Sequence, residues 1–186
     1  MQWIYENKDK FNIKVVCMSF GSQPLDVNDP LMLGAEALWN EGIVVVAAAG
    51  NSGPQKSSIK SPGISGKIIT VGALDDGRNN ESNNSKNYKT ASFSSRGPAY
   101  NFYKPDCLAP GVDIICASNK DDFYTKMSGT SVSAPIVAGS VALLLEKNPN
   151  LTPNQVKSKI MRSCQKIEFD RNSEGLGLIN TKYLCE

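Results

Sequence analysis

The sequence predicts an α/β protein built on a mainly parallel β-sheet. Short apolar runs alternate with segments of helical periodicity along the 186 residues, which is typical of strands joined by helices. The runs at 43–47 and 67–71 are apolar on successive residues, as expected of strands covered on both faces. No internal repeat or second domain boundary is visible, so we expect residues 1–186 to form one unit.

The first half of the chain contains three of the predicted strands and one helix. A strand is expected over 14–20, and a helix over 30–41, where apolar residues recur on one side. Gly42 is placed to end this helix. The strands at 43–47 and 67–71 follow it.

The second half begins with a polar segment and ends in helices. Residues 75–90 are almost entirely polar, which indicates a surface loop, and a further strand is predicted over 112–116. The helix predicted over 131–147 is apolar on nearly every side, as expected of a buried central helix. A last helix is predicted to open at Thr152-Pro153, because proline is favoured in a first turn.

Composition excludes several classes of function. The net charge of +2, without a basic stripe, argues against nucleic-acid binding. The longest apolar run, 43–49, is too short to cross a membrane, and residues 1–12 do not resemble a secretory signal. Five cysteines fit neither a disulfide framework nor a zinc site, which favours buried thiols and a cytoplasmic location. The chain contains no histidine, the commonest general base and metal ligand.

Two glycine-flanked polar clusters are candidates for a functional site. The first, 47–54, directly follows the most apolar predicted strand, and the second, 127–135, directly precedes the predicted central helix. Sites in α/β sheets form at the carboxyl ends of strands and at helix amino termini. Ser131 would have unpaired N–H groups beside it, and Asn51 could donate through its amide. Taken alone, Ser131 could equally be a helix N-cap, and Asn51 a turn residue of left-handed backbone.

Together the clusters resemble the subtilisin-like serine protease family. GTSVSAP, followed by IVAG, is similar to the nucleophile motif, and VVVAAAGNSG is similar to the oxyanion-binding segment. Further segments resemble the family in the same order: VVCMSFGS, SPGISGKIITVGAL, ASFSSRGP, LAPGVDIICA, and finally NPNLTPNQVKSKI and GLGLINTKYL for the last helix and a closing strand. The resemblance implies a three-layer sandwich whose amino-terminal strands are missing, with residues 1–186 as the carboxyl-terminal part of the domain.

The resemblance also implies serine endopeptidase chemistry on a peptide or protein substrate. Ser131 would attack the peptide carbonyl, while the Ser131 N–H and the Asn51 amide would hold the oxyanion. The pocket and cleft residues implied by the resemblance are Ser19, Phe20 and Gly21 on one side and Ala48, Ala49 and Gly50 on the other. No metal ligand is predicted, although the resemblance allows calcium.

Lys60 is the one expected departure in the substrate pocket. It precedes Ser61-Pro62, where many members of the family have a small residue at the pocket floor. A cation there would favour an acidic substrate side chain. Alternatively, the lysine head simply reaches solvent.

The missing base leads to the central expectation about activity. A serine hydroxyl is a weak nucleophile until a base removes its proton, and the family uses a histidine oriented by an aspartate. Without histidine, the isolated chain is expected to be inactive. The absent strands would also leave residues 15–18 as an open edge. We therefore expect a partner: the amino-terminal half of the domain, or a swapped copy of the same chain.

Two other functions remain as alternatives. The chain could be a catalytically inactive relative that binds a peptide or a partner through the same fold. It could also be an unrelated nucleotide-binding α/β domain, but no P-loop and no GxGxxG motif after a strand is present.

Overall fold

The predicted parallel sheet is confirmed. The computed structural model describes residues 1–26, 28–77, 88–119 and 123–185. Strands β1 (Val15–Met18), β2 (Val44–Ala48), β3 (Ile69–Asp75) and β5 (Cys107–Pro110) pair in parallel in the order β1-β2-β3-β5. A short strand, β4 (Lys89–Thr90), joins β3 in the antiparallel sense.

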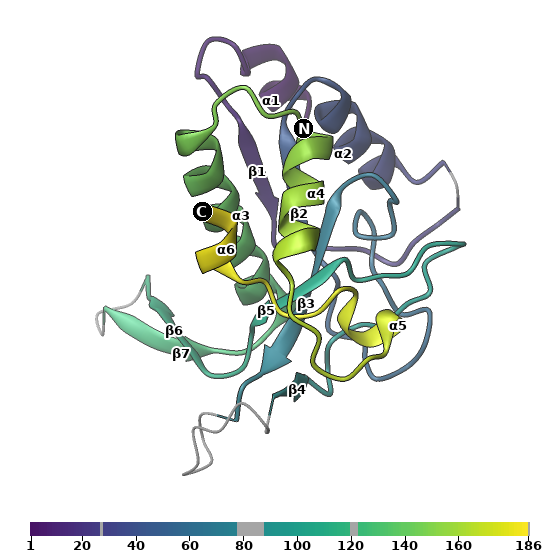
Figure 1. The fold of residues 1–186 in the computed structure, drawn as a ribbon. Helices are drawn as coiled ribbons and strands as arrows, with labels where there is room; N and C mark the ends of the chain where they lie inside the picture. Colours follow the sequence, from purple (N-terminus) through teal and green to yellow (C-terminus); the bar gives the residue numbers. More distant parts are fainter. Residues whose placement is uncertain (27, 78–87, 120–122, 186) are drawn as a thin grey trace.

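Helices cover both faces of this sheet, as a three-layer sandwich requires (Figure 1). On one side α3 (Thr130–Lys147) crosses strands β1, β2, β3 and β5 and packs with α4 (Pro153–Ser163) and α6 (Thr181–Cys185). On the other side α2 (Pro30–Asn40) contacts β2, and α1 (Gln2–Asn7) packs on α2. Among the residues that the structure describes, no helix combines the length and the apolar character needed to span a bilayer.

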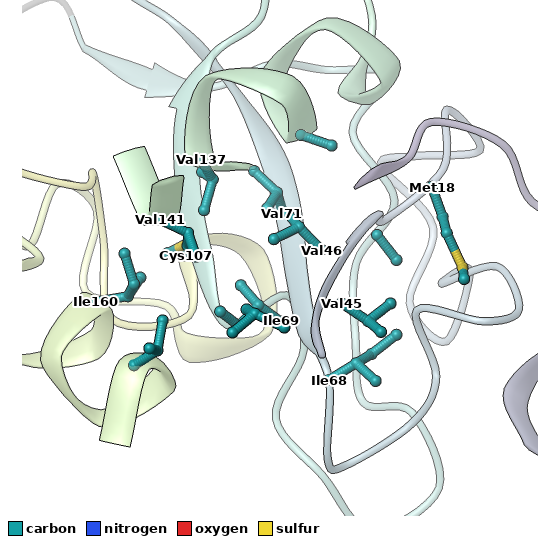
Figure 2. Packing of buried hydrophobic residues seen from close by; sticks show 14 of the residues in the cluster. Met18, Val45, Val46, Ile68, Ile69, Val71, Cys107, Val137, Val141 and Ile160 are labelled. Atoms are coloured by element: carbon teal, nitrogen blue, oxygen red, sulfur yellow. The ribbon is translucent and has the colours of Figure 1, made fainter. Parts of the chain in front are cut away.

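Strand β2 forms the centre of the hydrophobic core. All five of its residues are buried, because successive side chains point to opposite faces and both faces are covered. Figure 2 shows Val45 and Met18 on one side of the strands, and Val46 and Val71 on the other with Val137 of α3. The uninterrupted apolar run of β2 is therefore explained by its position between two helical layers.

Helix α3 differs from its prediction on one face. Pro135, Gly139, Ala142 and Leu143 are exposed, and Leu143 retains 56% of its accessible surface. The prediction of a helix buried on every side is therefore wrong for this chain. Within the described ranges, no segment covers this outer face.

Three local predictions are also corrected. The strand predicted over 112–116 lies outside the main sheet, where β6 (Ile114–Ala117) forms an antiparallel ribbon with β7 (Tyr124–Met127). The closing strand is reduced to isolated bridges at Leu178, and the chain then turns into α6. In the loop predicted over 75–90, β3 extends to its first residue and β4 forms its last two, while residues 78–87 lie outside the described part of the chain.

The last predicted helix, α4, opens as expected. The Thr152 hydroxyl accepts a hydrogen bond from the Gln155 N–H, and the Gln155 side chain accepts one from the Thr152 N–H. This reciprocal capping box satisfies two donors that a helix start would otherwise leave free. A four-residue helix, α5 (Arg171–Glu174), follows α4 and was not predicted.

Candidate active site

A hollow lies at the carboxyl ends of β1 and β2 and the amino terminus of α3. Its volume is about 290 Å³, and it joins segments that are up to 112 residues apart in the sequence. It is lined by Ser19, Phe20, Gly21, Ala48, Gly50, Asn51, Ser52, Lys60, Thr130 and Ser131. The two polar clusters of the sequence thus meet in one place, next to the segment that follows β1.

Residues 19–22 form one wall of the hollow, and backbone hydrogen bonds to Ser61 hold this wall in place. The Ser22 N–H donates to the Ser61 carbonyl at 3.0 Å, and the Ser61 N–H donates back at 3.0 Å. The Ser61 hydroxyl also bonds the Asp29 carboxylate, which accepts the first N–H groups of α2. Burial alone would raise the pKa of Asp29, but these hydrogen bonds outweigh it and lower the pKa.

The loop after β2 is fixed by contacts on two sides. The Gly50 N–H donates to the Thr130 hydroxyl at 3.1 Å, and the Gly50 carbonyl accepts the Ser95 N–H at 2.9 Å. Gly50 has a φ of +104°, and a Cβ there would lie 2.5 Å from Cγ of Lys60. Only glycine fits this turn without strain or collision.

The Asn51 side chain has a defined orientation. Its Oδ1 accepts hydrogen bonds from the Thr130 N–H at 2.9 Å and from the Thr130 hydroxyl at 3.0 Å. Because both donors face the oxygen, the amide nitrogen Nδ2 is turned the other way, and it has no acceptor in the part of the chain that the structure describes. Asn51 is not among the residues of positive φ, so the left-handed turn interpretation is wrong.

Ser131 is the second residue of α3, whose N-cap is Gly129. The interpretation of Ser131 as an ordinary N-cap is therefore also wrong. Its N–H, in the first helical turn, has no hydrogen-bond acceptor within the described part of the chain, whereas its neighbours Thr130 and Val132 have one each. A free N–H at the positive end of an 18-residue helix favours an anion at this point.

Ser131 and Asn51 converge on the same small volume. A Cβ placed on Gly129 would lie 3.1 Å from Oγ of Ser131 and 3.3 Å from Nδ2 of Asn51. The absence of a side chain at Gly129 therefore leaves a space that is bordered by a hydroxyl and an amide donor.

Most of the predicted pocket residues border the hollow, with one exception. Ala49 is fully buried in a small hydrophobic cluster with Met32, Ile59, Ile64 and Ala99. Neighbouring residues of extended backbone face opposite ways, so Ala49 points inward where Ala48 points toward the hollow. Sequence patterns did not single out Thr130 or Ser52, although Thr130 stands inside the motif that contains Ser131.

Lys60 crosses the floor of the hollow. Its stem passes close to Gly21 and Gly50, since a Cβ on either glycine would collide with it. Its Nζ donates to the Gln23 side-chain oxygen at 2.7 Å. Among the described residues, no carboxylate lies within ion-pair distance of this ammonium group.

The chain offers limited means for binding metal or moving protons at this site. Within the described ranges, no group of three or more His, Cys, Asp or Glu side chains converges as metal ligands would. The full sequence contains no imidazole that could accept the Ser131 proton. The site thus combines the Ser131 hydroxyl with two N–H donors, and the full sequence offers no imidazole beside them.

Comparison with known proteins agrees with this arrangement. A model of the subtilase family matches residues 1–178. Serine protease AprX of Bacillus subtilis is 42% identical over an alignment 201 residues long, gaps included, which covers 98% of this chain and 45% of AprX. Subtilisin DY of Bacillus licheniformis is 33% identical over 184 residues, covering 98% of this chain and 59% of that protein.

Solved structures give the same result at the level of the fold. The S41 psychrophilic protease superposes with a TM-score of 0.77 at 26% identity, covering 94% of this chain and 60% of that chain. Sphericase gives the same TM-score and identity, covering 94% of this chain and 59% of its own. The chain therefore spans about half to three-fifths of the length of these relatives.

Proposed function

Because the chain belongs to the subtilase family, we propose that it is the nucleophile-bearing part of a serine endopeptidase. The single observation that supports this most directly is the meeting of Ser131 and Asn51 beside Gly129. In this proposal Ser131 Oγ forms a bond to the carbonyl carbon of the substrate, and the carbonyl oxygen becomes an oxyanion. The Ser131 N–H and the Asn51 amide donate to that oxyanion, which lowers the barrier of the addition step.

The proton of the Ser131 hydroxyl must leave as this bond forms. A histidine held by an aspartate would take it and later pass it to the leaving amine. The chain has no histidine, so we assign the base to a polypeptide segment outside these residues. Water would then release the acyl group from Ser131 through the same base and the same oxyanion donors.

Two open surfaces support a missing segment. Within the described residues, β1 pairs with β2 on one edge alone, and Cys17 of β1 is exposed. The outer face of α3, which begins one turn from Ser131 at Pro135, is open as well. We assign both surfaces to the amino-terminal half of the protease domain, because an unpaired strand edge next to apolar surface is rarely left in water.

An active-site phosphonate probe tests the proposal. The isolated chain is expected to show no peptide hydrolysis and no labelling of Ser131. Addition of a polypeptide with the family's aspartate and histidine segments should produce both, with the label at Ser131 by peptide mapping. Such a polypeptide can be sought in the coding sequence directly upstream, or taken from the part of AprX that this chain does not match.

Each outcome of that experiment decides between the candidate functions. Labelling that depends on the added segment supports the split active site. No labelling with any complement, together with tight binding of an unmodified peptide, supports the alternative of an inactive binding module, which the absence of histidine favours. Sedimentation shows whether the open surfaces are occupied by the complement or by a second copy of this chain.

Lys60 leads to a prediction about substrate choice in the active complex. The Lys60 ammonium group has no carboxylate partner among the described residues, and it should favour glutamate over leucine before the scissile bond. For a half-exposed ion pair the preference should be about fivefold in kcat/KM. Substitution Lys60→Met keeps most of the stem and removes the charge, and should abolish the preference. The measurement is kcat/KM for a peptide series varied at that one position.

Two results would contradict this role of Lys60. Equal cleavage of the two peptides by the unsubstituted protein would place the ammonium group in solvent, as the alternative interpretation holds. An unchanged glutamate preference in Lys60→Met would place the selectivity elsewhere. The preference should also weaken as salt is added, because a half-exposed charge pair is screened.

A further inference from the structure

Ser95 binds the loop that carries Asn51, although it is not one of the described residues that line the hollow. Its N–H donates to the Gly50 carbonyl at 2.9 Å. Its hydroxyl accepts a hydrogen bond from the Ser52 N–H at 3.0 Å. Ser95 thus holds both residues that flank Asn51, one through its backbone and the other through its side chain.

Asn51 depends on these neighbours for its position. Within the described ranges its backbone N–H and carbonyl form no hydrogen bond of their own, and the residue is exposed. Its side-chain oxygen is tied to Thr130. The place from which the amide nitrogen Nδ2 is aimed is therefore set by the bonds of Gly50 and Ser52. Ser95 supplies a partner on each side of Asn51, and Thr130 supplies one more to the Gly50 N–H.

The segment that contains Ser95 is itself attached to the central sheet. Ser95 is fully buried, as is Ser94 before it. The Ala73 N–H, in β3, donates to the Ser94 hydroxyl at 3.1 Å, and the Ala73 carbonyl accepts the Ala91 N–H at 2.9 Å. Because protein interiors are closely packed, a buried hydroxyl anchored in this way has a fixed position. Ser95 therefore connects an exposed loop to the rigid part of the fold.

We propose that Ser95 is a positioning residue for the Asn51 amide, a role that rests on the proposed function of that amide as an oxyanion donor. Such a donor acts when it lies about 2.7–3.1 Å from the oxyanion, and a misplacement of about 1 Å costs up to about 100-fold in rate. Without the Ser95 hydroxyl, the Ser52 N–H loses its acceptor, and the loop shifts to bring that N–H to water. The amide of Asn51 then moves away from its working position.

Kinetics of the reconstituted complex test this role. Ser95→Ala should lower kcat about tenfold and leave KM nearly unchanged, a smaller loss than the roughly 10²–10³ of removing such an amide outright. In a chain that already carries Asn51→Ala, the change Ser95→Ala should lower kcat by less than about twofold, because no amide is left to position. A purely structural role of Ser95 would reduce kcat by the same factor in both backgrounds.

Ser94 offers a matched control. It is as buried as Ser95, and its hydroxyl also accepts a backbone N–H, but that N–H belongs to β3 rather than to the Asn51 loop. Ser94→Ala should lower the unfolding midpoint about as much as Ser95→Ala and leave kcat within about twofold, because the Ala91 N–H still attaches the segment to the sheet. Ser95→Thr keeps the hydroxyl and should recover most of kcat, even where the added methyl group lowers the midpoint.

NMR on the isotopically labelled chain tests the same contacts without any activity. In the unsubstituted chain the Ser52 amide proton should exchange with solvent slowly and the Asn51 amide proton quickly, since only the first has an acceptor within the described part of the chain. In Ser95→Ala the backbone order parameter of Asn51 should fall from about 0.85 to below about 0.6. In Ser94→Ala it should stay at its original value.

The proposal is overturned by a Ser52 amide proton that exchanges as fast as that of Asn51, or by an unchanged order parameter in Ser95→Ala. The exchange measurement needs no variant, so it decides the question even where substituted chains do not fold. A complex that is inactive with every complement would end the proposed function, while NMR would still decide how the loop is held. An active complex in which Asn51→Ala lowers kcat and Ser95→Ala does not would refute the positioning role alone.

Discussion

Substitution Ser131→Ala in the reconstituted protease is expected to lower kcat by about 10⁶. The size comes from subtilisin, a member of this family, in which loss of the nucleophile removes the covalent step and leaves only the residual effect of binding and oxyanion stabilisation. We expect the same here, because the two proposed oxyanion donors, the Asn51 amide and the Ser131 N–H, survive the change. The measurement is single-substrate kinetics with a fluorogenic peptide.

The control for Ser131→Ala is another serine near the same helix. Ser128 is exposed, and among the described residues its hydroxyl forms hydrogen bonds with Asp113 alone. Ser128→Ala should leave kcat within about twofold of the unsubstituted complex. A Ser131→Ala complex that retained a tenth of the original turnover would show that another group is the nucleophile.

Substitution Asn51→Ala is expected to lower kcat by about 10²–10³ and to leave KM nearly unchanged. This magnitude is also that of subtilisin, where one oxyanion-binding amide was removed. The effect falls on kcat because the amide donates to a charge that develops only in the transition state. The two constants are compared in the reconstituted complex, with Asn40→Ala at the exposed end of α2 as the control.

The Asn51 variant also removes the acceptor for two donors of Thr130. Its unfolding midpoint is therefore measured beside its kinetics, so that a local shift of α3 is detected. A loss of less than threefold in kcat would remove Asn51 from the oxyanion site. A rise in KM with constant kcat would instead assign the amide to ground-state binding.

The parts of the fold that sequence could predict are those with a strong local pattern. Strand β2 is a continuous apolar run, and α4 opens on a capping threonine followed by proline, so each can be predicted from a few residues. The ribbon of β6 and β7 has no such local pattern. Strand β7 is exposed at all four positions, and it exists only because β6 offers its backbone edge, which no local pattern reveals.

In the candidate site, too, residues with a local sequence pattern could be predicted and residues that depend on distant contacts could not. Ser131 and Asn51 stand in glycine-flanked motifs, and their approach follows from the rule that strand ends and helix starts meet at one edge of the sheet. The role of Thr130 in turning the Asn51 amide could not be predicted, because it depends on a contact across 79 residues. The sequence placed Ala49 in the pocket because Ala48 and Gly50, on either side of it, line the hollow. Side chains alternate in direction along extended backbone, so Ala49 points into the core instead.

Sequence analysis did not predict the largely buried ionic cluster of Lys104, Asp106 and Lys157 for a further reason. Charged residues look like ordinary surface positions in a sequence, because buried charges are rare. Lys157 also donates to the carbonyls of residues 66–68, and every residue has a backbone oxygen. No local pattern therefore marks this cluster.

The open outer face of α3 has a consequence for when such an enzyme can act. If nucleophile and base reside on separate molecules, the amount of competent enzyme follows mass action, and below the dissociation constant a tenfold dilution of both leaves about a hundredth of it. Either half could then be synthesised without risk of digesting its neighbours. Proteolysis would start only where the two accumulate together, so the concentration of the two halves would control when the enzyme is active.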